Sequence, residues 1–326
     1  MKTPVAVVMR LVALCAIFIG LSHSAVFAQP YPSRAVTIVT PFAAGSVTDA
    51  AARLIGQHLQ DALGQTFIIE NKAGAGGLLA ASTVARAKPD GYTLLLTTNS
   101  THSVVYGLFK SVPYDPIADF TPIARVGNFP SFVAVNVAQP INTMAELVAY
   151  AKANPGKLTY GVGNSTSQIT GETIKKRTGV DIVRVAYRSN PQAMTDLIAN
   201  HIPMMIPDLN VGLPQLKAGK IRALAVLTKG RNSVLPDVPT LNETVMPGFD
   251  ILAWAGMFGP ANLPPDVVKT LAEELQRALA KPEIKDKLTA AGTEVYFSGP
   301  VDFTAFVKAE LPRWTAMIKE AGIEPE

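Results

Sequence analysis

The chain has 326 residues, of which 48% are apolar and 17% are charged, a composition that can bury a large core. These values exclude a disordered chain, a collagen-like chain and a small disulfide-stapled scaffold. The formal net charge is +4, and it falls to +2 when Lys2 and Arg10 at the N-terminus are set aside, so we expect no nucleic-acid partner.

The N-terminus has the pattern of a secretory signal peptide. Lys2 and Arg10 precede an apolar run over residues 11–21, and Ala28 supplies a small residue at a cleavage point. A membrane anchor is the alternative, but a spanning helix needs roughly 20 apolar residues, about twice this run. We expect residues 1–28 to be a signal peptide that is removed on export to the periplasm. Cys15, the only cysteine, lies inside it, so the exported chain would have no thiol.

Beyond this segment, short β-rich runs alternate with helical ones, which predicts an α/β fold in which crossover helices join parallel strands. The first set of elements consists of strands at 36–39, 67–69 and 93–96 with helices at 51–62 and up to about residue 88. The proline-dotted stretch 113–130 lacks a sustained period and is expected to be loop.

A second set of α/β elements follows, and the chain becomes almost purely helical from Pro264 onward. The second set consists of strands at 132–135, around 160, at 182–185, 204–206 and 223–227, with helices at 144–153, 170–177 and 193–199. We expect lobe 1 to comprise residues 29–128 and 252–326 and lobe 2 residues 129–251. A ligand cleft would lie between these lobes and close by hinge motion.

Three loops between a strand and a helix are rich in small hydrogen-bonding residues, and ligands of α/β sheets bind beyond the carboxyl ends of the strands. The candidate ligand-binding residues in these loops are Phe42, Ala43, Ala44, Gly45, Ser46, Thr48 and Asp49 in the first, Asn99 and Thr101 in the second, and Gly163, Asn164, Ser165, Thr166 and Ser167 in the third. Free backbone N–H groups at a helix start suit a carboxylate. The first loop taken alone could equally be an ordinary cap, and the other two taken singly are more typical of turns and caps. Three loops that converge favour binding.

Two further residues are candidates for the same cleft. The guanidinium of Arg188 could hold a carboxylate through two parallel hydrogen bonds, or it could pair structurally with Asp196 or Asp208. Asp208 follows Pro207 and could cap a turn or orient loop amides.

No pattern indicates a cofactor, a metal or a catalytic centre. Gly74 and Gly76 match the first two glycines of a dinucleotide fingerprint, but Leu79 occupies the third place. The sequence also lacks a P-loop, a Gly-x-Ser-x-Gly elbow and a His-Glu-x-x-His pair. His58 falls on the apolar side of a helix, whereas His102 follows a Ser/Thr-rich run. We expect a non-enzymatic protein and keep a secreted hydrolase that uses His102 as the alternative.

Over nearly the whole exported chain, the segments resemble the Bug receptors, the extracytoplasmic solute-binding proteins of tripartite tricarboxylate transporters. The likeness is carried by Tyr-Pro-Ser-Arg at 31–34, Pro-Phe-Ala-Ala-Gly at 41–45, Glu-Asn-Lys-Ala-Gly-Ala-Gly-Gly at 70–77, Pro-Asp-Gly-Tyr-Thr-Leu at 89–94, Val-Ala-Tyr-Arg at 185–188 and Leu-Pro-Asp-Val-Pro-Thr at 235–240. It departs from the family at Ser46 and Ser189, where the family often has glycine.

The resemblance implies a two-lobed, type II periplasmic-binding-protein-like fold of the Venus-flytrap kind. It implies a small carboxylate ligand, held by loop amides, hydroxyls and bridging waters, and membrane transporter subunits as partners of a monomer. By this likeness, the loop 42–49 grips the proximal carboxylate, while the loop 161–168 and the segment around Arg188 face it from the other lobe. A ligand-sensing input to a signalling system would share the same binding physics.

Overall fold

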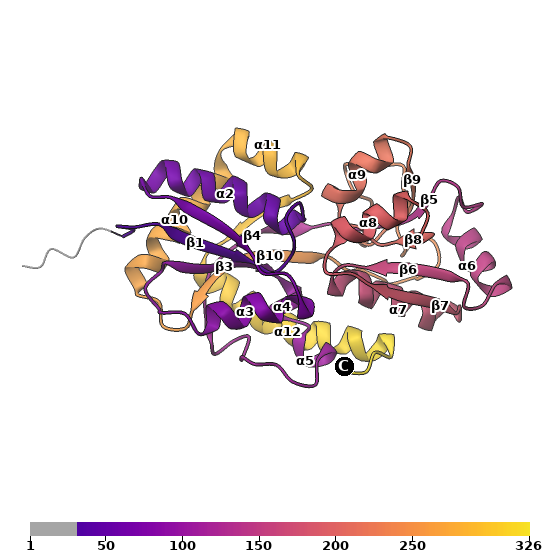
Figure 1. Ribbon diagram of the computed structural model, residues 1–326, viewed down its shortest axis with the longest axis horizontal. Helices are drawn as coiled ribbons and strands as arrows, with labels where there is room; N and C mark the ends of the chain where they lie inside the picture. Colours follow the sequence, from indigo (N-terminus) through magenta and orange to yellow (C-terminus); the bar gives the residue numbers. More distant parts are fainter. Residues whose placement is uncertain (1–30) are drawn as a thin grey trace, which may run out of the picture. The chain divides into compact units, whose positions relative to one another are not determined.

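The computed structural model describes residues 31–326, so the expected signal peptide and its cleavage near Ala28 lie outside the described residues. Residues 34–326 form one compact unit. It contains two β-sheets with helices packed on them, which confirms the α/β class (Figure 1). No helix among residues 31–326 is both long enough and apolar enough to cross a membrane.

The first sheet has six strands in the order β11-β4-β10-β3-β1-β2. Its strands are β1 (Val36–Thr40), β2 (Phe67–Asn71), β3 (Thr93–Thr98), β4 (Phe120–Phe129), β10 (Ala253–Pro260) and β11 (Glu294–Ser298). β1 pairs in parallel with β2 and β3, whereas β10 runs antiparallel to β3 and β4. The sheet is therefore mixed, and the expectation of parallel strands holds only for β1 to β3.

Helices cover both faces of this sheet (Figure 1). On one face α2 (Val47–Leu63) lies with α10 (Pro265–Ala280) and α11 (Pro282–Ala290), and on the other lie α3 (Leu78–Ala85) and the start of α12 (Pro300–Ala321). The N-cap of α2 is Ser46, whose side chain accepts a hydrogen bond from the Asp49 N–H, and the helix ends at Gly64 with φ 70°. The cap sets the start of α2 beyond the carboxyl end of β1.

The second sheet has five strands in the order β7-β6-β8-β5-β9. Its strands are β5 (Phe132–Asn136), β6 (Leu158–Val162), β7 (Ile182–Ala186), β8 (Met204–Met205) and β9 (Ile221–Val226), and its helices are α6 (Met144–Ala153), α7 (Ser165–Thr178), α8 (Asn190–Ile198) and α9 (Leu209–Lys217). β6 is parallel to β7 and β8, whereas β5 is antiparallel to β8 and β9. The carboxyl end of β6 leads directly into α7, as the carboxyl end of β1 leads into α2.

Two chain crossings and one helix join the sheets. Residues 130–131 connect β4 to β5, and residues 227–252 connect β9 to β10. α12 packs Phe303 and Val307 into the core of the first sheet and Trp314 and Ile318 into that of the second. The return of the chain to the first sheet agrees with the expectation from the sequence, but the lobe boundaries at residues 128 and 252 stay a prediction.

The stretch 113–130 was expected to be loop, and this expectation is wrong because it contains β4. The strand lies between β10 and β11, so its pairing partners come from the C-terminal part of the chain. Its Pro122 lies beside a register shift in the pairing with β10, a place where a strand tolerates a residue without an N–H. β11 likewise interrupts the region from Pro264 onward that was expected to be almost purely helical.

Two candidate loops are partly helical. Residues 99–102 form the short helix α4 (Asn99–His102), which is followed by α5 (Val105–Leu108). α7 begins at Ser165 rather than Thr170, because Asn164 accepts from the Ser167 N–H and Ser167 Oγ accepts from the Asn164 N–H. The third candidate loop is thus largely a helix cap and first turn.

Candidate functional site

The loop between β1 and α2 is held in place by the buried carboxylate of Asp49. Its Oδ2 accepts the Gly45 N–H at 3.0 Å, its Oδ1 accepts Asn71 Nδ2 at 3.0 Å, and Arg53 Nη2 pairs with it at 2.9 Å. Burial raises the pKa of Asp49, but the bonds from Arg53, Gly45 and Asn71 outweigh burial and bring the net pKa below 3.8. Asp49 therefore positions the loop rather than facing a cavity.

The starts of four helices meet around one small cavity of about 10 Å³. α2 contributes Thr48, α4 contributes Asn99, α7 contributes Thr166, and α9 contributes its N-cap Asp208. Thr48 and Asn99 are fully buried, and Thr48 Oγ1 and Asn99 Oδ1 have no hydrogen-bond partner. The cavity therefore has polar groups from both sheets with unused hydrogen-bonding capacity.

Side chains from the two sheets touch beside this cavity. Ser100 Oγ lies 2.7 Å from Ser165 Oγ, and Asn99 Nδ2 lies 3.4 Å from Ser165 Oγ and 3.4 Å from Thr166 Oγ1. All four residues are buried. The two sheets are thus closed upon each other at this point.

Asp208 is a buried acid that joins three segments of the second sheet to the cavity. Its oxygens accept Ser131 Oγ at 3.0 Å, Asn164 Nδ2 at 3.2 and 3.3 Å, and Asn190 Nδ2 at 2.7 Å. Burial raises the pKa of Asp208 to about 6, although these three hydrogen-bonding side chains lower it. The only charged side chain lining the cavity within residues 31–326 is therefore an acid whose charge is disfavoured.

A larger pocket of about 370 Å³ adjoins this cavity and shares Phe42, Ser100 and Asn164 with it. Its other lining residues are Gly74, Ala75, Gly76, Leu108, Phe109, Val162, Gly163, Ser165, Gln168, Arg184, Ala186, Tyr187, Arg188 and Glu326. Together the cavity and the pocket form the candidate site. Neutral polar groups and Asp208 line the cavity at its inner end, and Arg184, Arg188 and Glu326 line the pocket at its outer end.

Arg188 stands exposed at the outer end of the site. The structural pairing with Asp196 or Asp208 that was considered for it does not form. Asp196 accepts Tyr187 Oη at 2.6 Å, and the three partners of Asp208 are neutral side chains. Arg184, which sequence reasoning did not select, forms an ion pair with Glu326 in the same pocket.

Nine of the predicted residues line the cavity or the pocket, and seven do not. Those that line it are Phe42, Thr48, Asn99, Gly163, Asn164, Ser165, Thr166, Arg188 and Asp208, and those that do not are Ala43, Ala44, Gly45, Ser46, Asp49, Thr101 and Ser167. Ser46 and Ser167 are engaged as helix caps. Whether any of these residues binds a ligand stays a prediction.

Sequence reasoning considered Gly74 and Gly76 as an incomplete dinucleotide fingerprint and did not place the loop Gly74–Gly76 at the site. Gly76 has φ 61°, and a Cβ there would lie 2.5 Å from the Phe109 ring. Only glycine fits this backbone conformation without a clash, so the Gly-rich segment was a visible signal in the sequence. That the segment lines the pocket depends on the fold.

His102 lies in the core below the site. Its ring stacks on Phe258 with centroids 4.0 Å apart, and its Nδ1 lies 2.8 Å from Thr101 Oγ1. The side chain is fully buried, and burial lowers the pKa of His102 to about 3. An imidazole in this position packs the first sheet and does not reach the cavity, which it does not line.

A model of the tripartite tricarboxylate transporter receptor family matches residues 51–323. The chain belongs to this receptor family. BugT of Bordetella pertussis (strain Tohama I) is 31% identical over 318 residues, which cover 96% of this chain and 98% of BugT. The resemblance to the Bug receptors is therefore confirmed.

Two solved structures of relatives were determined with acids bound. Rpa4515 of R. palustris, solved with adipate, is 35% identical with a TM-score of 0.88 and covers 91% of this chain and 100% of its own. MatC from Rhodopseudomonas palustris, solved with malate, is 33% identical with a TM-score of 0.84 and covers 88% of this chain and 100% of its own. The Venus-flytrap fold is confirmed, and since the family consists of solute-binding receptors, the chain is not an enzyme.

Proposed function

We propose that this receptor captures a small organic acid by one carboxylate in the periplasm and delivers it unchanged to membrane transporter subunits. Its membership of the tripartite tricarboxylate transporter receptor family supports the delivery step. Relatives with adipate and malate bound support an acid as the ligand class. The proposal includes release of the signal peptide near Ala28, action as a monomer, and closure of residues 29–128 and 252–326 on residues 129–251.

The observation that carries the proposal is the meeting of helix starts at one cavity. The N-terminal ends of α2, α7 and α9 each carry partial positive charge, which favours an anion. The hydroxyl of Thr48 and the amide of Asn99 supplement them. A hydrogen bond to a charged group contributes about 1.5–3 kcal/mol, so a few of them suffice for micromolar affinity after the costs of closure.

The same lining explains how the acid can leave again. No lysine or arginine lines the inner cavity among residues 31–326, so dipoles and neutral donors hold the carboxylate instead of a salt bridge. Opening the two sheets separates Ser100 from Ser165 and returns both sets of donors to water. Capture and release then depend on closure, as expected for a receptor that passes its ligand on.

The test is binding of adipate and malate to the protein lacking residues 1–28, by calorimetry and thermal denaturation, with the neutral adipamide as the uncharged control. We expect at least one acid to raise Tm, adipamide to have no effect, and mass spectrometry to recover the acid intact. An acid panel without any stabilisation, or conversion of an acid to product, contradicts the proposal.

A pair of isosteric variants places the ligand within the protein. Thr48→Val removes an unpartnered buried hydroxyl that lines the cavity, and Thr170→Val removes one that lies on α7 outside it. We expect Thr48→Val to weaken binding several-fold and Thr170→Val to leave it unchanged. Equal changes in Kd for Thr48→Val and Thr170→Val would place the acid outside the inner cavity.

A further inference from the structure

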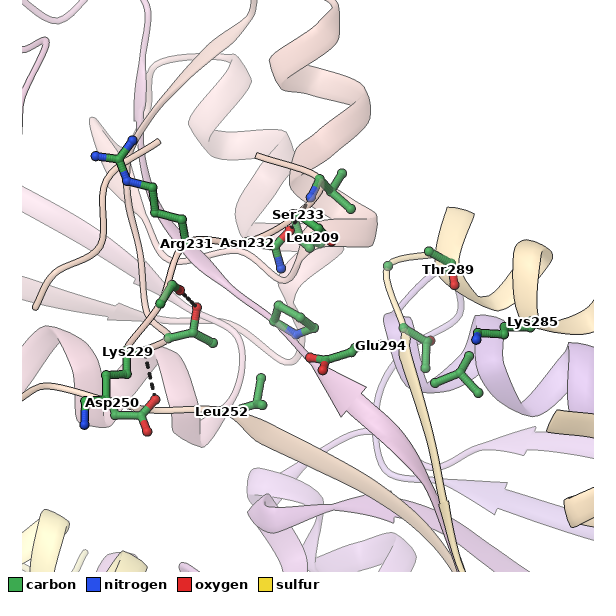
Figure 2. A pocket seen from close by; sticks show the side chains of 17 residues that line it. Leu209, Lys229, Arg231, Asn232, Ser233, Asp250, Leu252, Lys285, Thr289 and Glu294 are labelled. Atoms are coloured by element: carbon green, nitrogen blue, oxygen red, sulfur yellow. Dashed lines mark hydrogen bonds between the residues drawn. The ribbon is translucent and has the colours of Figure 1, made fainter. Parts of the chain in front are cut away.

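A further pocket of about 640 Å³, here called the rear pocket, lies behind the candidate site and was not expected from the sequence. One wall comes from α11 and β11 with Lys285, Thr289 and Glu294, and the other comes from residues 228–234, which belong to the second sheet's side (Figure 2). Among residues 31–326, no hydrogen bond or ion pair joins residues 285–295 to residues 228–234. The walls can therefore move relative to each other without breaking a bond.

The rear pocket and the inner cavity of the candidate site lie on opposite sides of one layer of chain. Phe129, Asp208 and Ala253 line the inner cavity of the site, and their direct neighbours Pro130, Leu209 and Leu252 line the rear pocket. At Phe129–Pro130 and Leu252–Ala253 this follows because successive residues of extended chain point to opposite sides, whereas Leu209 is the first residue of α9. The three segments are also bonded to one another, because Ala253 pairs with Phe129, and the Leu209 N–H donates to the Pro130 carbonyl at 3.0 Å.

This layer includes both chain crossings between the sheets, so rotation about it has opposite effects on its two sides. Closing the front, where Ser100 meets Ser165, moves the rear walls apart, and opening the front brings them together. In the structure the front is closed and the rear pocket is wide. Bulk in the rear pocket then disfavours the open form and leaves the closed form undisturbed.

One contact at the rear is already close in the closed form. Gly292, in the turn between α11 and β11, lies so close to α9 that a Cβ would stand 2.4 Å from the backbone nitrogen of Asn210. Asn210 Nδ2 in turn donates to the Gly45 carbonyl of the front loop at 3.4 Å. Opening the front narrows the rear further, so added bulk at Gly292 disfavours the open form more than the closed form.

We infer that the rear pocket and the Gly292 contact are positioning elements that set the affinity of the acid site through the hinge, without touching the ligand. The inference rests on the proposed function. A ligand that binds only the closed form has an apparent Kd that falls as the closed fraction rises. If the closed form is about 1% of the unliganded protein, raising it to about 10% lowers Kd about tenfold.

The first test is a wedge in the rear pocket with a control on the same helix. Thr289→Trp places a large side chain at the pocket wall, and Ala290→Trp places the same side chain at the next position of α11. Both positions are exposed, but only Thr289 lines the pocket. We expect Thr289→Trp to lower the Kd for adipate or malate about tenfold, as estimated above, and Ala290→Trp to leave it unchanged. Equal Kd values for the two variants overturn the inference.

The second test is a clash with a control of equal backbone strain. Gly292→Ala adds a Cβ at φ 78° against Asn210, and Gly64→Ala adds one at φ 70° with nothing within 4 Å. Left-handed strain is the same in open and closed forms and cancels from Kd, although it lowers the stability of both variants. We expect Gly292→Ala to lower Kd several-fold and Gly64→Ala to leave it unchanged, and an unchanged or raised Kd in Gly292→Ala overturns the inference.

A ligand-free measurement separates this inference from the proposed function. Leu79 lies in α3, which packs on the first sheet, and Val183 lies in β7 of the second sheet. Both are exposed, and they can carry spin labels as cysteines because the chain has no other cysteine after Cys15. If the unmodified protein binds neither acid, the choice of ligand fails, but Thr289→Trp is still expected to shift the label distances toward the shorter population. Distances identical to those of Ala290→Trp overturn the hinge inference.

Discussion

Substitution of Asp208 by asparagine tests the electrostatics of the site directly. The carboxylate is 5% exposed, and burial raises its pKa to about 6 from its ordinary value of 3.8. Between these pH values the folded protein retains a proton that the unfolded chain has lost. The free energy of unfolding therefore decreases as pH rises from about 4 to about 6, because the unfolded state binds fewer protons than the folded state.

The size of this effect follows from the difference between the two pKa values. About two pKa units at about 1.36 kcal/mol each give a loss of about 3 kcal/mol across this range. The amide introduced by Asp208→Asn does not titrate, and Asn190 can turn its own amide so that Oδ1, which has no partner, accepts from the new one. The variant therefore keeps a hydrogen bond at this position while it loses the pH dependence.

The measurement is urea unfolding of the unmodified protein and Asp208→Asn at several pH values from 4 to 7. Other titrating groups are shared, so they cancel from the difference between the two free energies of unfolding. We expect the unmodified protein to lose about 3 kcal/mol relative to the variant as pH rises. A constant difference over this range refutes the argument that Asp208 carries the proton.

Four further predictions concern binding and stability. We expect the affinity for the acid to rise as pH falls from 7.5 to 6, because an anion in the cavity favours protonated Asp208. If calorimetry shows that Kd of Asp208→Asn depends on pH as strongly as Kd of the unmodified protein, this prediction is contradicted. Ser100→Ala removes the 2.7 Å contact across the sheets and costs about 1 kcal/mol of binding energy, about fivefold in Kd, while Tm without ligand changes little. Gly163→Ala places a Cβ 2.3 Å from the Asn190 backbone nitrogen, and we expect it to lower the free energy of unfolding by about 1–3 kcal/mol. An unchanged free energy of unfolding in denaturant would show that Gly163 and Asn190 are not tightly packed. Asp49→Ala releases the loop between β1 and α2, and we expect it to lower the free energy of unfolding by about 1.5–3 kcal/mol at pH 7. The loss becomes smaller below pH 4, because the pKa of Asp49 is lowered in the folded protein and protonation removes the stabilisation. An equal loss at pH 7 and below pH 4 would contradict a charged Asp49.

The candidate site was predictable as far as it depends on local chain. The hydroxyl and amide residues after β1, β3 and β6 mark helix starts, and the sequence places them beyond strands. Nothing local distinguishes Thr48, which lines the cavity, from Ser46, which caps α2, since both are small hydroxyl residues at one helix start. The role of Arg184 and the Gly74–Gly76 loop depends on contacts between distant segments.

The sequence by itself determined the α/β class, the helices with a clear apolar face such as α2 and α10, and the family to which the chain belongs. These depend on spacing within one segment or on the order of motifs, and both are present in the unfolded chain. Only the tertiary structure decided the strands β4 and β11, the convergence of four helix starts on one cavity, and the rear pocket across the layer from it. A strand such as β4 is stabilised by pairing with partners from the far end of the chain, and a cavity is formed by residues from several distant segments. Neither therefore leaves a periodic pattern in one segment of the sequence.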